Sequence, residues 1–190
     1  MSSATSTAPA APSTGLTQWE IDPSHSSVQF SVRHMMVSNV RGEFTRLSGT
    51  VQIDSRDIGR SSVHAVMDAG SISTREEKRD EHLRSADFLD VANHPTIEFQ
   101  STRVTREANG SLKLVGNLTV RGVTREVVLD VEDGGSELRD PWGNTKRGAS
   151  ATTRLNRKEF GLQWNVALET GGIVVGDELK VEIDVELLKK

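Results

Sequence analysis

The sequence predicts an all-β protein whose strands form an antiparallel sheet with one apolar face and one solvated face. Apolar and polar residues alternate along most of the chain, and short turn sequences separate the alternating segments. Such alternation is typical of antiparallel sheets that cover a core on one side. A closed barrel and a two-sheet sandwich would both show it, so periodicity does not choose between them. In the last strand, charged residues separate the apolar residues Leu179, Val181, Ile183, Val185 and Leu187.

Breaks in the alternation divide the first half of this sheet into strands. Pro23-Ser24 predicts a turn, and Arg41-Gly42 predicts a turn or a bulge. The phase of the apolar residues changes after Phe44, which predicts a bulge near Thr45 and Arg46. The residues expected to point toward the core are Val28, Phe30, Val32, Leu47, Val51, Ile53, Val63, Ala65, Met67 and Ala69.

A charged segment without alternation predicts a helical excursion near 74–90. Ser73 or Thr74 can cap a short polar helix, with Glu76 or Glu77 as the capping-box partner. A second helical turn then carries two apolar residues that would hold the excursion against the sheet. That turn is capped by Ser85, is anchored by Phe88 and Leu89, and ends before Pro95.

The second half returns to alternating strands. Asn109-Gly110 is a strong hairpin signal, Arg121-Gly122 predicts another turn, and a short helical turn is expected near 157–161. The inward residues of these strands are mostly aliphatic, and several of them are small. Before the last strand they are Ile97, Phe99, Leu112, Leu114, Gly116, Leu118, Val120, Val127, Leu129, Val131, Ala149, Ala151, Thr153 and Leu155.

Composition excludes several classes of function. The net charge is −4 and no basic stripe is present, so neither nucleic acid nor an anionic membrane is an expected partner. Cysteine is absent, which excludes disulfides, zinc thiolates and cysteine nucleophiles. The five histidines match no zinc-binding spacing, so no metal or cofactor is predicted. No apolar run reaches the roughly 20 residues of a membrane span.

The first residues, 1–17, are rich in Ser, Thr, Ala and Pro and predict a flexible tail. They lack the basic and apolar regions of a secretory signal, so we expect a cytoplasmic location. The remaining residues, 18–190, predict one β domain, since barrels and sandwiches often reach this size undivided.

Five sequence segments resemble the YceI-like family of lipid-binding proteins. They are HLRSADFLD and HPTIEFQS within 82–101, WEIDPSHSSVQFSVRH at 19–34, GNLTVRGVTREVVL at 116–129 and RKEFGLQWN at 157–165. The resemblance is in register over nearly all of the chain after its first fifteen or so residues. It implies a lipocalin-like antiparallel barrel of about eight strands, which holds an isoprenoid or another long-chain lipid. The family often carries a secretory signal, and in this respect the chain differs.

A lipid site inside the barrel is consistent with the inward residues. Small residues leave volume that a hydrocarbon can fill, although the same pattern also fits an ordinary core in which small residues face large ones. Trp164 is expected to line or cap the pocket, and His34 or Arg154 could contact a polar head group. The predicted lining residues are Phe30, Val32, Phe44, Val51, Ile53, Met67, Ile97, Phe99, Leu118, Val120, Leu129, Ala149, Ala151, Trp164, Val181 and Ile183.

We therefore predict non-catalytic binding, storage or transport of a long-chain lipid, such as a polyisoprenoid or quinone-like molecule. The alternative is an enzyme that acts on a lipid held in the same barrel. No catalytic residue is predicted, because Ser85 is better explained as a cap than as the nucleophile of a site with His82 and Asp87. A homodimer is a further expectation, with Val66 and Val128 on the outer face.

Overall fold

The protein folds into a closed antiparallel barrel of eight strands, as predicted. The structure is a computed structural model that describes residues 15–169 and 172–190. Strand β12 closes the ring, because it pairs with β11 along one edge and with β1 along the other. The barrel strands are β1 (Leu16–Ile21), β4 (Leu47–Asp54), β5 (Ser62–Asp68), β7 (Thr96–Arg106), β8 (Leu112–Val120), β9 (Val123–Asp133), β11 (Thr145–Asn156) and β12 (Val175–Lys189).

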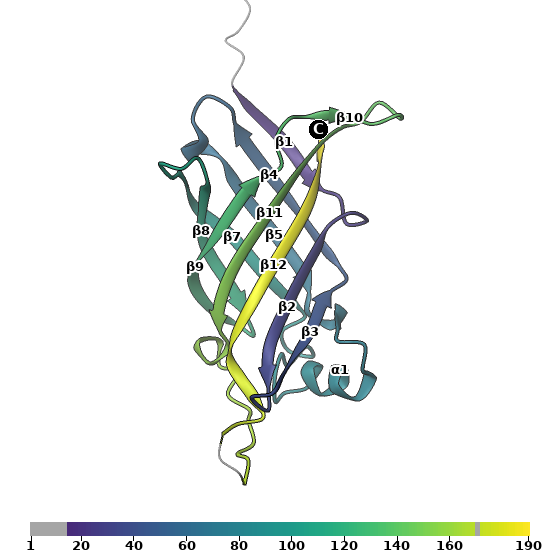
Figure 1. Ribbon diagram of the computed structural model, residues 1–190. Coiled ribbons are helices and arrows are strands. Elements are labelled where there is room, and N and C mark those ends of the chain that lie inside the picture. Colours follow the sequence, from purple (N-terminus) through teal and green to yellow (C-terminus); the bar gives the residue numbers. More distant parts are fainter. Residues whose placement is uncertain (1–14, 170–171) are drawn as a thin grey trace, which may run out of the picture.

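Within the described residues, four further strands, one α-helix and three 3-10 helices complete the fold. Figure 1 shows α1 at the lower end of the barrel beside β3, while β10 lies at the upper end. No helix in the described ranges is both long and apolar enough to cross a membrane. These elements are β2 (Ser27–His34), β3 (Ser38–Phe44), β6 (Ile72–Ser73), β10 (Leu138–Arg139), α1 (Glu77–Arg84), η1 (Ile58–Arg60), η2 (Ala69–Ser71) and η3 (Arg157–Phe160).

Two walls of the barrel are each built from a pair of consecutive strands. The C-terminal part of β12 pairs with β1 and its earlier part pairs with β2, so β1 and β2 follow one another along the same edge. Strands β3 and β4 pair with β2 and β1 in the same way. The bulge predicted near Thr45 and Arg46 is the break between β3 and β4.

The predicted turn or bulge at Arg41-Gly42 is wrong, because β3 runs through both residues. Gly42 is needed there for packing. A Cβ atom at this position would lie 2.4 Å from Cζ of Phe30, whose ring crosses the strand. The chain turns instead at Met35 and Met36, which both adopt left-handed backbone conformations with φ of 48° and 62°.

The predicted caps of α1 are also wrong. Glu76 is the N-cap, and its carboxylate accepts hydrogen bonds from the backbone N–H groups of Lys78 and Arg79. The left-handed conformation of Arg75, with φ of 62°, separates Thr74 from the helix. The hydroxyl and backbone N–H of Thr74 instead donate to the buried carboxylate of Asp80, at 2.5 and 2.8 Å.

The remaining turns lie where the sequence places them. Gly110 and Gly122 have positive φ in the two predicted hairpins, and Gly161 ends η3 in the left-handed region. Phe88 and Leu89 are each 7% exposed, so the second helical turn is anchored against the barrel as predicted. The predicted flexible tail, 1–17, falls outside the described residues except for 15–17, and β1 begins at Leu16.

Candidate functional site

The candidate site is a cavity of about 360 Å³ inside the barrel. All eight barrel strands contribute to it, together with β2, β3 and the segments near α1 and η3. This volume lies in the range of about 300–1,000 Å³ that is usual for small-molecule sites. Its wall is almost entirely aliphatic and aromatic, because the inward positions of the alternating strands carry these residues.

Most of the predicted lining residues meet around this one cavity. The two alanines of β11 leave space beside the larger side chains of β9 and β12, with which they pair. The predicted residues that line the cavity are Phe30, Val32, Phe44, Val51, Ile53, Met67, Ile97, Phe99, Leu118, Val120, Leu129, Ala149, Ala151, Val181 and Ile183.

Not every small inward residue creates space. Gly116 lies under the ring of Phe99, where a Cβ atom would lie 2.5 Å from the Phe99 Cζ atom. Gly116 therefore belongs to an ordinary packed core, in which a small residue faces a large one, and it does not add to the cavity. The volume therefore depends on Ala65, Ala149 and Ala151, which line the cavity, and not on Gly116.

Three predicted contact residues lie outside the cavity lining. Trp164 packs against the rings of His82 and Phe88, with centroids 4.8 and 5.2 Å away. Arg154 pairs with Glu178 of the neighbouring strand, and His34 lies at the end of β2. The part of Arg154 and His34 in head-group binding remains a prediction.

One end of the cavity is covered by aromatic and aliphatic side chains near α1. Leu83, Phe88 and Leu89 line this end, and Phe88 contacts His82 and Trp164 from behind. The His82 imidazole Nε2 lies 2.8 Å from Oδ2 of Asp87, which fixes the ring. Because the cover comes from α1, from the turn after it and from the segment after η3, opening this end requires these three segments to separate.

Arg157 holds the segment after η3 in place. Its side chain is 4% exposed and donates to the carbonyl oxygens of Leu162, Trp164 and Gly176, at 2.5–2.9 Å. Burial lowers the pKa of this guanidinium, while the nearby Asp177 carboxylate opposes that effect. The group is still protonated at any physiological pH. Arg157 therefore fixes the backbone beside the cavity through buried hydrogen bonds.

The other end of the cavity carries the charged pair Arg147 and Asp133. The Arg147 guanidinium donates to both carboxylate oxygens of Asp133, from Nε at 3.2 Å and from Nη2 at 2.5 Å. Both residues are part of the cavity wall. Neither residue is among the predicted site residues, because Asp133-Gly134-Gly135 reads as a turn. The alternation of Ala149 and Ala151, continued backward by two residues, would have placed Arg147 on the inner face.

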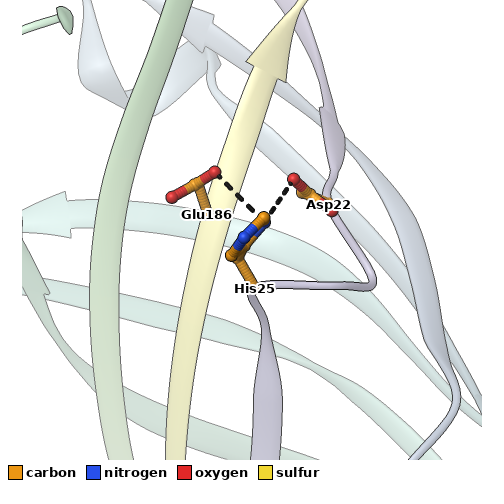
Figure 2. A group of neighbouring side chains, drawn as sticks. All are labelled: Asp22, His25 and Glu186. Carbon is orange, nitrogen blue, oxygen red and sulfur yellow. Dashed lines mark hydrogen bonds and ion pairs between the residues drawn. The ribbon is translucent and has the colours of Figure 1, made fainter. Parts of the chain in front are cut away.

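A second charged cluster lies on the outside of the barrel, at the break between β1 and β2. Asp22, His25 and Glu186 bring potential metal ligands within 4.8 Å of one another (Figure 2). His25 Nδ1 is 2.9 Å from Asp22 Oδ2 and 3.6 Å from Glu186 Oε1. The Lys146 ammonium lies 2.5 Å from Glu186 Oε1 and 3.6 Å from Asp22 Oδ2, so it offsets one of the two carboxylate charges. These ion pairs explain the arrangement, because they connect the end of β1 with β11 and β12.

The hydrolase-like trio Ser85, His82 and Asp87 is not assembled as a nucleophile and base. The Ser85 hydroxyl donates to the backbone carbonyl of His82 at 2.7 Å, and it accepts from the N–H of Asp87 at 3.3 Å. These are the bonds of a capping residue, as the sequence predicts.

Comparison with known proteins decides the family. The family model described as YceI-like domain matches residues 19–187. The chain is 36% identical to a UPF0312 protein of Staphylococcus aureus strain N315 over 171 residues, which cover 90% of this chain and 97% of that protein. The chain belongs to the YceI-like family.

Solved structures share the same fold. The YceI protein of Campylobacter jejuni has a TM-score of 0.70 and 27% identity, covering 83% of this chain and 90% of that one. BcnA of Burkholderia cenocepacia has a TM-score of 0.74 at 18% identity, covering 87% of this chain and 98% of that one. A polyisoprenoid binding domain from Saccharophagus degradans, implicated in plant cell wall breakdown, has a TM-score of 0.65 at 12% identity, covering 90% and 98%.

Proposed function

We propose that this YceI-like protein binds a long-chain lipid of the isoprenoid class in the barrel cavity and carries or stores it chemically unchanged. The observation that supports this most directly is the aliphatic cavity, whose wall extends from the covered end near α1 to the Arg147–Asp133 pair. The family and the Saccharophagus domain, which is described as polyisoprenoid binding, support the same ligand class.

Chain burial supplies the affinity in this proposal. Each methylene that moves from water into an apolar interior contributes about 0.8 kcal/mol. Affinity should therefore rise about fourfold for each added methylene until the cavity is full. Because the wall is mostly aliphatic, the length of the tail is expected to matter more than any single polar contact.

Carriage is favoured over catalysis by the state of the charged groups in the wall. Arg147 is paired with Asp133, and Arg157 is engaged by backbone carbonyls. A general acid or base needs a group within reach of the substrate and free to exchange a proton. The paired groups at both ends of the cavity do not fit that requirement.

Native mass spectrometry of freshly purified protein tests the proposal. We expect a bound lipid in a one-to-one ratio, which solvent extraction then identifies as a prenyl or other long-chain molecule. The lipid should remain unchanged after incubation with the protein. Chemical turnover would support the enzyme instead. An empty protein that binds none of a panel of prenyl and acyl chains would contradict lipid binding altogether.

A cytoplasmic location and a homodimer remain part of the proposal. Val128 is 45% exposed on the outer face, which is compatible with a contact between two barrels. Sedimentation at high concentration measures the oligomeric state, and a monomer under these conditions would exclude the dimer.

A further inference from the structure

The charged end of the cavity is built on the inner faces of two neighbouring strands. Arg147 shares the inward phase of Ala149 and Ala151 on β11, and Asp133 shares the inward phase of Val131 on β9. Strands β9 and β11 are paired at this point, with Ala149 opposite Asp133. Figure 1 shows that the start of β11 lies at the end of the barrel away from α1.

The backbone holds the two charged residues in register. Gly134 N–H donates to the carbonyl oxygen of Gly148 at 3.0 Å. A Cβ atom on Gly134 would lie 2.5 Å from that oxygen, so the two strands approach as closely as glycine allows. The side chains of Arg147 and Asp133 are 23% and 33% exposed, which places them at the boundary between the cavity and water.

The pair presents one unused donor group and no net charge. Nε and Nη2 of Arg147 donate to Asp133, while Nη1 donates to no acceptor within residues 15–169 and 172–190. Ser61 also lines the cavity, and its hydroxyl accepts from the backbone N–H of Asp54. A ligand whose tail fills the barrel would therefore meet the Nη1 group beside a carboxylate.

This chemistry separates neutral head groups from anionic ones. A carbonyl or hydroxyl oxygen can accept from Nη1, and a hydroxyl can also donate to the Asp133 carboxylate. A phosphate or carboxylate would accept the same bond, but Asp133 cancels most of the attraction that the guanidinium would otherwise exert on it. The attraction that is left does not offset the cost of taking an anion out of water at the mouth of an apolar cavity.

We infer that Arg147 and Asp133 form a head-group site that selects lipids with an uncharged oxygen head, such as a prenyl alcohol, aldehyde, quinone or ester. The inference rests on the proposed function, since it needs a lipid tail in the barrel. The two residues determine specificity, and the aliphatic wall supplies most of the affinity.

The test compares ligands that share one tail. Geranylgeraniol, geranylgeranial, geranylgeranyl monophosphate and the hydrocarbon of the same carbon skeleton are titrated against a fluorescent lipid bound to the full chain. We expect the alcohol and the aldehyde to bind about tenfold tighter than the hydrocarbon and the monophosphate, as one hydrogen bond to a charged group implies.

Removal of charge at the site provides the decisive variants. Asp133→Asn leaves the Arg147 charge unbalanced and should move the ranking toward the monophosphate by about tenfold. The double variant Arg147→Leu with Asp133→Leu should bind all four ligands alike. The matched control is Lys113→Leu with Asp130→Asn, an ion pair of β8 and β9 that is not part of the cavity wall. It should leave the wild-type ranking unchanged.

The outcomes keep the two proposals apart. If the wild-type protein binds none of the four ligands, the proposed lipid function is wrong. If it binds all four equally, or the monophosphate most tightly, lipid binding stands and the neutral head-group site is overturned. If Asp133→Asn folds and leaves the ranking unchanged, the pair does not determine specificity.

Discussion

At the scale of single residues, the charges outside the barrel connect its strands. Asp22 lies at the break between β1 and β2, where its carboxylate accepts from the backbone N–H of Ser24 and is bonded to His25. Lys146 of β11 and Glu186 of β12 complete the cluster. The hydrogen bond with His25, followed by that from Ser24, lowers the pKa of Asp22 below its ordinary value of 3.8.

The lowered pKa gives a prediction about acid stability. Because the folded state favours the ionised carboxylate, its contribution is complete above the unfolded pKa and is lost as the pH falls through the folded pKa. Asp22→Asn should therefore lower the free energy of unfolding near pH 7 by about 1 kcal/mol. The difference between the two proteins should shrink as the pH falls through the lowered folded-state pKa of Asp22.

Urea denaturation between pH 7 and pH 2.5 measures this difference. Asp184→Asn, which removes a charge from an exposed position of β12, serves as the control and should change stability little at any pH. A constant difference between wild type and Asp22→Asn across the whole range would show that the Asp22 charge does not contribute.

At the scale of elements, the turn between β2 and β3 has an unfavourable backbone conformation. Met35 and Met36 are both left-handed, a conformation that costs other residues roughly 1–2 kcal/mol relative to glycine. The carbonyl of Met36 accepts two bonds from the Arg33 guanidinium, at 2.8 and 3.1 Å, and these would survive a change of side chain.

We expect Met36→Gly to raise the free energy of unfolding by about 0.5–1 kcal/mol, because release of strain exceeds the added entropy of the unfolded chain. Equilibrium urea denaturation measures the change. Val37→Gly is the matched control, since Val37 is exposed and its φ is not positive. It should lower stability. Equal losses in both variants would mean that the turn is not strained.

The elements also show what the sequence can and cannot predict. The alternation of the strands predicts which residues line the barrel, because one face of each strand must be apolar wherever it covers the interior. The Met35-Met36 turn and the Glu76 cap carry no such signal. They follow from left-handed residues that tertiary contacts stabilise, and glycine, the usual marker, is missing from both places.

The candidate site divides in the same way. Its aliphatic wall is readable from periodicity, whereas the Arg147–Asp133 pair depends on which strands become neighbours. Strands β9 and β11 pair with each other, but residues 134–144 separate them in the sequence. These residues include β10, which pairs with β11 outside the ring of barrel strands. Trp164 is predicted to line or cap the pocket, and it is not among the residues that line the cavity. In the structure it covers Phe88 from the outside.

At the scale of the whole molecule, the interior of the barrel contains a cavity where a fully packed core would otherwise be. Ala151 is 9% exposed, lies between Val131 and Ile183 in the sheet, and faces this space. Replacing it with phenylalanine puts an aromatic ring where the lipid tail is proposed to lie. Overpacking a filled core typically costs about 1–3 kcal/mol, and a real cavity should reduce that cost.

Ala151→Phe should therefore abolish binding of a prenyl chain while changing the free energy of unfolding by less than about 1 kcal/mol. Fluorescent lipid displacement measures binding, and urea denaturation measures stability. The control is Thr152→Phe, which adds the same ring to the exposed face of β11 and should bind lipid normally.

Ala149→Leu, a smaller addition to the same wall, should shorten the longest tail that binds. Unchanged affinity in both alanine variants would place the lipid elsewhere. A loss of stability of about 3 kcal/mol or more in Ala151→Phe would show a filled core in place of a cavity.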